Sequence, residues 1–94
     1  MRRLVPSAKF VRNSRKYLAK HPEHLEDIGL VMQKLALNPF EASLEAHKLK
    51  GLFARYWSCT VAYDLRIIFE FVKDPNEAED TIILIDVGKH DEVY

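Results

Sequence analysis

The hydrophobic period of this chain changes near residue 57, and this change constrains the fold more than any other feature. Before that point, apolar residues recur at helical spacing. After it, apolar residues alternate with polar or small ones, first at Trp57, Cys59, Val61 and Tyr63. Alternation is the period of a strand that has one buried face. The chain is therefore expected to place helices first and strands second, which is the order of an α+β domain.

Prolines divide the helical part into two segments. The first runs from about Ser7 to Lys20, with Ser7 as its N-cap, and it ends because a residue before proline avoids helical geometry. The second begins at Pro22 and stops at Asn38-Pro39. Its buried stripe is predicted to consist of Leu25, Ile28, Gly29, Met32, Leu35 and Ala36. Because the break is short, an antiparallel helical hairpin is expected.

Two further strands are predicted after the alternating segment, at Arg66–Val72 and Thr81–Val87. The turn signal Asp74-Pro75-Asn76 lies between them and predicts a hairpin. Ile82–Ile85 is apolar throughout, which is typical of a central strand covered on both faces. Arg2–Val5 is a candidate short strand that Pro6 would stop.

The expected fold is therefore α+β, with a two-helix N-terminal hairpin packed on one face of a small twisted antiparallel sheet, and a short N-terminal strand as a further candidate. With 94 residues, the chain has room for one core, so residues 1–94 are expected to form a single domain. No apolar run approaches the ~20 residues of a membrane span. The single cysteine, Cys59, excludes an internal disulfide framework and indicates a buried thiol in a cytoplasmic protein. No glycine-rich phosphate loop or metal-ligand pattern is found, so no cofactor and no metal are expected.

Charge is distributed unevenly although the formal net charge is zero. The first twenty residues contain basic side chains and no acid, whereas acids dominate the last twenty-five. On the first helix, one basic stripe is formed by Lys9, Arg12, Lys16 and Lys20. Such a stripe is either a solvated helix face or a surface for an acidic partner.

Polar residues that can carry chemistry gather near the strands. His47 stands beside Lys48 and Lys50, while Asp64 and Arg66 lie at a strand junction. The segment after the last strand adds Lys89, His90 and Tyr94. Together they suit metal-free RNA cleavage, in which a 2′-hydroxyl attacks the adjacent phosphate. That step needs a general base, a general acid and cations for the phosphoryl oxygens.

Three segments carry a resemblance to a known family. They are His47-Lys48-Leu49-Lys50-Gly51, Tyr63-Asp64-Leu65-Arg66-Ile67-Ile68-Phe69 and Ile85-Asp86-Val87-Gly88-Lys89-His90-Asp91-Glu92-Val93-Tyr94. With the helix-helix-sheet order, the chain resembles RelE/ParE-superfamily toxins of bacterial type II toxin–antitoxin modules, and within them the YafQ-like branch. The resemblance implies a RelE-like fold and a ribonuclease that cuts messenger RNA on the translating ribosome.

The resemblance also implies roles and partners. The catalytic set would be His47, Asp64, His90 and Tyr94. RNA phosphate would be bound by Lys48, Lys50, Arg66 and Lys89. The basic stripe of the first helix would contact the ribosome or the antitoxin. The implied partners are a cognate antitoxin, the ribosome with its messenger RNA, and operator DNA through the antitoxin complex, without a membrane.

The chain departs from both branches of the superfamily. YafQ-like enzymes have a histidine where this chain has Thr60 and an aromatic residue where it has Leu65, and RelE-type relatives have lysines at Trp57 and Cys59. Two alternatives therefore stay open. One is a ParE-like toxin that inhibits DNA gyrase, a branch that usually lacks the histidine matched by His90. The other is an inactive homologue that binds only its antitoxin and operator DNA.

Overall fold

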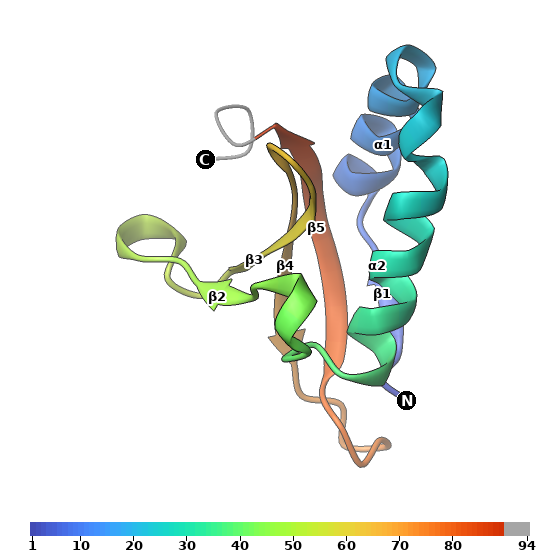
Figure 1. The fold of residues 1–94 in the computed structure, drawn as a ribbon. Helices are drawn as coiled ribbons and strands as arrows, with labels where there is room; N and C mark the ends of the chain where they lie inside the picture. Colours follow the sequence, from blue (N-terminus) through green and yellow to red (C-terminus); the bar gives the residue numbers. More distant parts are fainter. Residues whose placement is uncertain (90–94) are drawn as a thin grey trace.

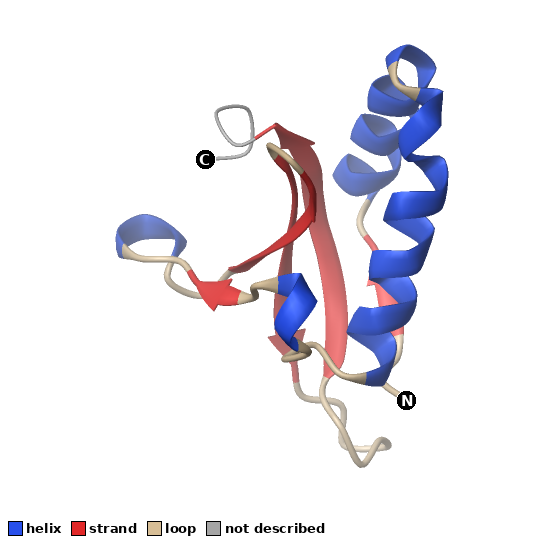
Figure 2. Ribbon diagram, in the orientation of Figure 1, coloured by secondary structure: helices blue, strands red, loops and turns tan. Residues whose placement is uncertain are grey.

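The computed structural model describes residues 1–89 and consists of two helices packed on one face of a five-stranded sheet (Figures 1 and 2). The chain begins with β1 (Leu4–Pro6), α1 (Ala8–Lys20), a 3₁₀ turn η1 (Pro22–His24) and α2 (Leu25–Leu37). It continues through η2 (Ala42–Leu44), β2 (His47–Lys48), η3 (Gly51–Phe53), β3 (Trp57–Ala62), β4 (Leu65–Val72) and β5 (Thr81–Lys89). The predicted α+β class and order of elements are confirmed.

The sheet has the strand order β1-β5-β4-β3-β2 and is mixed rather than wholly antiparallel. The meander β3-β4-β5 is antiparallel, as expected, and β2 extends it antiparallel at one edge. At the other edge the predicted N-terminal strand is present, but it pairs with β5 in parallel. β1 includes Pro6, although this proline was expected to stop the strand. An edge strand tolerates a residue without an N–H.

Both ends of α1 and the end of α2 lie where the sequence signals place them, but the predicted start of the second helix at Pro22 is wrong: Pro22–His24 form the 3₁₀ turn η1, and α2 begins at Leu25. The Ser7 hydroxyl accepts a hydrogen bond from the Phe10 amide at 3.1 Å, so Ser7 is the N-cap of α1. The same hydroxyl donates to the Ile85 carbonyl at 3.0 Å and ties the start of α1 to β5. α2 ends at Leu37, before Asn38-Pro39.

The predicted buried stripe of the second helix is partly wrong. Ile28, Leu35 and Ala36 are buried, but Leu25 is 62% exposed and Gly29 is also exposed. Val31, which the prediction omitted, is buried instead. The hairpin end of the helices projects past the end of the sheet (Figure 1), so the start of α2 has no sheet to pack against.

The core lies between the helices and the sheet. Its buried residues are Phe10, Ile28, Val31, Leu35, Leu44, Cys59, Leu65, Ile67, Phe69, Ile82, Leu84 and Val87. The prediction that β5 is covered on both faces is correct for one face only. Ile82 and Leu84 are fully buried, whereas Ile83 and Ile85 are half-buried. Among the described residues, no helix is long and apolar enough to cross a membrane.

Candidate functional site

The face of the sheet that points away from the helices carries the candidate site. His47 pairs with Ser58, and Thr60 pairs with Arg66. Residues paired across neighbouring strands share a face, and so do residues two apart on one strand, such as Ser58 and Thr60. His47, Thr60 and Arg66 therefore all project from the same face. Cys59, between Ser58 and Thr60, points the opposite way into the core. The sheet therefore separates this face from the helical layer.

His47 lies on the short edge strand β2 with its side chain exposed. Its Nδ1 is 3.2 Å from the backbone carbonyl oxygen of Glu45. A carbonyl oxygen can only accept, so Nδ1 must carry the proton of this hydrogen bond. In the neutral ring, Nε2 is then unprotonated and available to accept a proton. Glu45 is in the left-handed conformation, with φ of 50°, which turns its carbonyl at the entry to β2.

Arg66 lies near the start of β4, the central strand of the sheet, between Thr60 of β3 and Gly88 of β5. Its guanidinium donates to the carbonyl oxygens of Ala62 and Leu65, at 3.3 Å each. These two bonds hold the side chain near the β3–β4 turn. Within residues 1–89, Arg66 forms no ion pair with a carboxylate, so its positive charge is not neutralised there.

Asp64 is the second residue of the two-residue turn that joins β3 to β4, as its predicted place at a strand junction requires. Its φ of 64° is left-handed, a conformation that aspartate adopts more readily than most residues. Tyr63, beside it, is fully exposed. Because Arg66 is bonded to the carbonyl of Ala62 at the base of this turn, Asp64 and Arg66 lie at the same end of the sheet.

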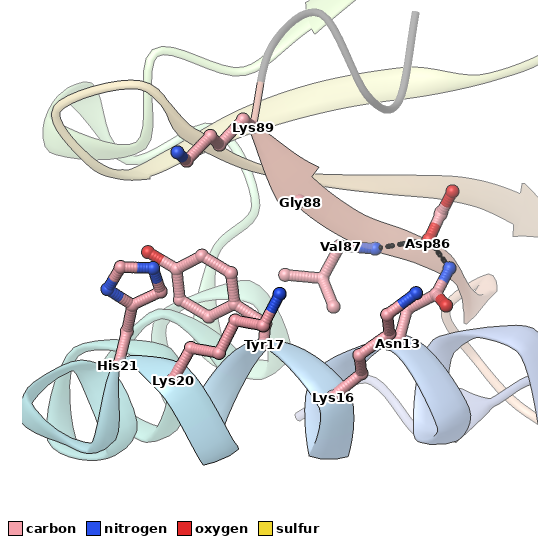
Figure 3. Close-up of a pocket in the computed structure, with 9 residues that line it drawn as sticks. All are labelled: Asn13, Lys16, Tyr17, Lys20, His21, Asp86, Val87, Gly88 and Lys89. Atoms are coloured by element: carbon pink, nitrogen blue, oxygen red, sulfur yellow. Dashed lines mark hydrogen bonds between the residues drawn. The ribbon is translucent and has the colours of Figure 1, made fainter.

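The lysines predicted to bind RNA phosphate do not gather around His47. Lys48 pairs with Trp57, so it points to the opposite face from His47. Lys50 is exposed and precedes η3. Gly51, the next residue, has a φ of 65°, a conformation that residues with a side chain rarely adopt. Lys89, at the end of β5, extends on the helical side of the sheet, where it lines a pocket against α1 (Figure 3). The three lysines of the predicted phosphate-binding set therefore do not lie on one surface.

The basic stripe of α1 is also divided. Lys9 forms an ion pair with Asp86 at 3.4 Å, and Arg12 is exposed. Lys16 and Lys20 line the pocket between α1 and β5 (Figure 3). The other pocket residues on this helix and in the turn after it are Asn13, Tyr17 and His21.

The pocket also contains four residues that were not predicted from the sequence as site residues: Asn13, Tyr17, His21 and Asp86. A signal was available for two of them. Asn13, Lys16, Tyr17 and Lys20 are spaced i, i+3, i+4 and i+7, which places them on one face of a helix. Asp86 had no such signal, since it was one acid among several in an acidic region.

Three further expectations concern reactivity. Burial raises the pKa of the Cys59 thiol to about 12, which leaves little thiolate near neutral pH and argues against a nucleophile. Among residues 1–89, no group of histidine, cysteine and carboxylate side chains is arranged to hold a metal ion. His90 and Tyr94, two of the predicted catalytic residues, lie outside the described residues.

Comparisons with known proteins agree with this architecture. Residues 2–94 match the model of the family described as the bacterial toxin of type II toxin–antitoxin system, YafQ. The structure is similar to that of YafQ from E. coli strain BL21(DE3), with a TM-score of 0.79 and 18% identity over 100% of this chain and 99% of that one. A comparison with curated protein sequences finds no match.

Two more solved structures have the same fold. One is the toxin in the E. coli DinJ–YafQ toxin–antitoxin complex, with a TM-score of 0.77 and 18% identity over 99% of this chain and 97% of that one. The other is a metal-bound toxin from Helicobacter pylori, with a TM-score of 0.76 and 26% identity over the whole of both chains.

Proposed function

The chain belongs to the YafQ family of toxins of bacterial type II toxin–antitoxin systems, and we propose that it is a metal-independent endoribonuclease that cleaves messenger RNA on the translating ribosome. The observation that carries this proposal is the placement of His47 and Arg66 on one face of the sheet, away from the helices. The first supplies a proton acceptor and the second a fixed cation, and strand cleavage of RNA needs both.

In the proposed reaction, the ribose 2′-oxygen attacks the adjacent phosphorus atom while the bond from phosphorus to the 5′-oxygen breaks. His47 Nε2 accepts the proton of the 2′-hydroxyl, because its Nδ1 already donates to the Glu45 carbonyl. A general acid gives a proton to the leaving 5′-oxygen. The products are a 2′,3′-cyclic phosphate and a free 5′-hydroxyl.

Arg66 would bind the non-bridging phosphoryl oxygens, where negative charge accumulates in the transition state. Its guanidinium is already held by the Ala62 and Leu65 carbonyls, so little side-chain reorganisation is needed when RNA binds. Its donors not used in these two bonds can reach the phosphate, since guanidinium has five N–H groups.

The remaining roles follow the family resemblance. His90 is proposed as the general acid, Tyr94 as a stacking partner for a base, and Asp64 as a second acid–base group at the β3–β4 turn. Lys48 and Lys50 would contact phosphates of the RNA strand beyond the scissile one. Thr60 stands beside Arg66, at the place of the family's second histidine, so His47 and His90 would share the proton transfers between them.

The proposed partners are a cognate antitoxin, the ribosome with its messenger RNA, and operator DNA through the antitoxin complex. The E. coli relative forms a complex with DinJ, which supports an antitoxin for this chain as well. Arg12 and the neighbouring cations of α1 offer a basic surface that suits either an acidic antitoxin segment or ribosomal RNA.

Induction of this gene alone in bacteria tests the proposal. Growth and translation should stop, and messenger RNA should acquire new 5′-hydroxyl ends. His47→Ala and Arg66→Ala should relieve the toxicity, whereas Lys73→Ala, which removes an exposed cation elsewhere, should not. Growth arrest with intact messenger RNA and failed DNA replication would establish a gyrase inhibitor instead. Normal growth with retained antitoxin binding would establish a binding-only homologue.

A further inference from the structure

A pocket of about 300 Å³ lies between α1 and the C-terminal end of β5, on the helical side of the sheet. Figure 3 shows Lys16 and Lys20 extending from α1 toward β5, and Lys89 at the end of that strand. The pocket is thus separated by the sheet from the face that carries His47 and Arg66. A water molecule takes up about 30 Å³ in the liquid, so the pocket has room for a group several times larger than one water molecule.

The pocket lining contains more lysines, among them Lys16 and Lys20, than acids. Within residues 1–89, neither Lys16 nor Lys20 forms an ion pair or a hydrogen bond through its amine. Asp86 is the acid in the lining, and other groups already engage it. It accepts from the Asn13 amide at 2.7 Å and from the Val87 N–H at 2.8 Å, and it pairs with Lys9. The amines of Lys16 and Lys20 therefore remain available to an anion.

Aromatic rings form one wall beside these amines. Tyr17 and His21 are stacked with their ring centroids 4.7 Å apart and their planes at 29°. The Tyr17 hydroxyl lies 2.7 Å from His24 Nδ1, which fixes the orientation of the tyrosine ring. Flat rings next to cationic side chains match a nucleotide, since a base can stack where its phosphate is neutralised.

We propose that this pocket binds one nucleotide of an RNA strand, with the phosphodiester held by Lys16 and Lys20 and the base against the His21 ring. The inference rests on the proposed function only in taking RNA as the ligand. The pocket binds RNA outside the cleavage face, so it holds or orients the strand and performs no chemistry on it.

Fluorescence anisotropy with a labelled single-stranded RNA, at several salt concentrations, tests this proposal. Lys16→Gln/Lys20→Gln removes the two cations that neutralise this one phosphate, so the slope of log affinity against log salt should become shallower by about 0.7. At 0.1 M salt this corresponds to a loss of about 5-fold in affinity. The matched control is Arg15→Gln/Lys73→Gln, which removes the same charge from exposed positions outside the pocket and should change affinity less than 3-fold.

Separate arms identify the ligand. In NMR titrations, inorganic phosphate should shift the amides of residues 13–21 and 86–89 in the unaltered protein but not in Lys16→Gln/Lys20→Gln. His21→Ala should keep the phosphate response and weaken RNA binding by about 5-fold or more, because the stacking wall is lost. Circular dichroism should show that every variant is folded.

Two outcomes would overturn the proposal. One is an equal loss of RNA affinity in the control pair, which would reduce the effect to net charge. The other is unchanged RNA binding together with lost binding of an oligoglutamate peptide, which would make the pocket a site for acidic protein segments. Cleavage is not measured in any arm, so a protein that fails as a ribonuclease can still pass this test.

Discussion

Asp86 should be among the most sensitive polar residues of the fold, because it joins β5 to α1. Its side chain is largely buried, at 9% exposure, and it has three partners: Asn13, Val87 and Lys9. β1 pairs with β5 only as far as Leu84, so Asp86 lies where β5 has lost that neighbour. There its carboxylate satisfies a backbone N–H and holds the helix against the strand.

The size of the effect follows from these partners. A hydrogen bond to a charged group contributes about 1.5–3 kcal/mol, and the exposed Lys9 ammonium adds at most about 1 kcal/mol. Asn13 is half-buried and can turn toward water when its partner is lost. Asp86→Ala should therefore lower the free energy of unfolding by about 2–4 kcal/mol, or the melting temperature by about 10–25 °C. Asp86→Asn keeps an acceptor for Val87 and should cost about half as much.

Urea unfolding followed by circular dichroism measures this series, with Asp27→Ala on the exposed side of α2 as the control. Asn13→Ala removes one of the three partners and should cost about 1 kcal/mol. The double variant Asn13→Ala/Asp86→Ala should be less destabilised than the sum of the two single changes, because both remove the same bond. A loss below 0.5 kcal/mol for Asp86→Ala, or strict additivity, would refute the assigned role.

Three further predictions concern single residues. Arg66→Ala should lose about 10²–10³-fold in ribonuclease activity. Arg66→Lys should keep only part of the activity, because the two carbonyls hold a guanidinium in place. Equal activity of the two variants in single-turnover assays would contradict this. His90→Ala should lose about 10²–10⁴-fold in cleavage and keep antitoxin binding in a pull-down, and unchanged cleavage would remove it from the mechanism. Burial raises the pKa of the Cys59 thiol from 9.0 to about 12, so the folded protein should carry about a thousandfold less thiolate at pH 8. The thiol should therefore resist iodoacetamide until the protein unfolds. Because the raised pKa favours the thiol in the folded state, its contribution to stability is present below pH 9 and decreases above it.

Most of the fold could be predicted from local signals. Ser7, the prolines at 22 and 39 and the Asp74 turn act through their immediate neighbours, so the sequence alone locates both ends of α1, the end of α2 and the β4–β5 hairpin. The parallel pairing of β1 with β5 could not be predicted, since it joins segments nearly eighty residues apart. The two-residue strand β2 is too short to show a period of its own.

For the candidate site, the sequence indicates which residue types are present but not how they are arranged in space. The sequence places Asp64 and Arg66 at a strand junction, which the structure confirms, but it does not predict the strand β2 that carries His47. That Lys48 and Lys89 face other surfaces depends on the β2–β3 register and on the end of β5, which only the structure gives. The pocket beside α1 is formed by two segments distant in sequence, Asn13–His21 and Asp86–Lys89, and it could not be predicted from either alone.

The central claim is that RNA is cut on the sheet face that carries His47. Single-turnover cleavage of a messenger RNA on programmed ribosomes, with the purified protein, tests it most directly. The account predicts a 2′,3′-cyclic phosphate at the new 3′ end, a rate that falls by about 10²-fold or more in His47→Ala, and an unchanged rate in Lys73→Ala. Cleavage by His47→Ala at the rate of the unaltered protein, or a product with a 5′-phosphate, would contradict it.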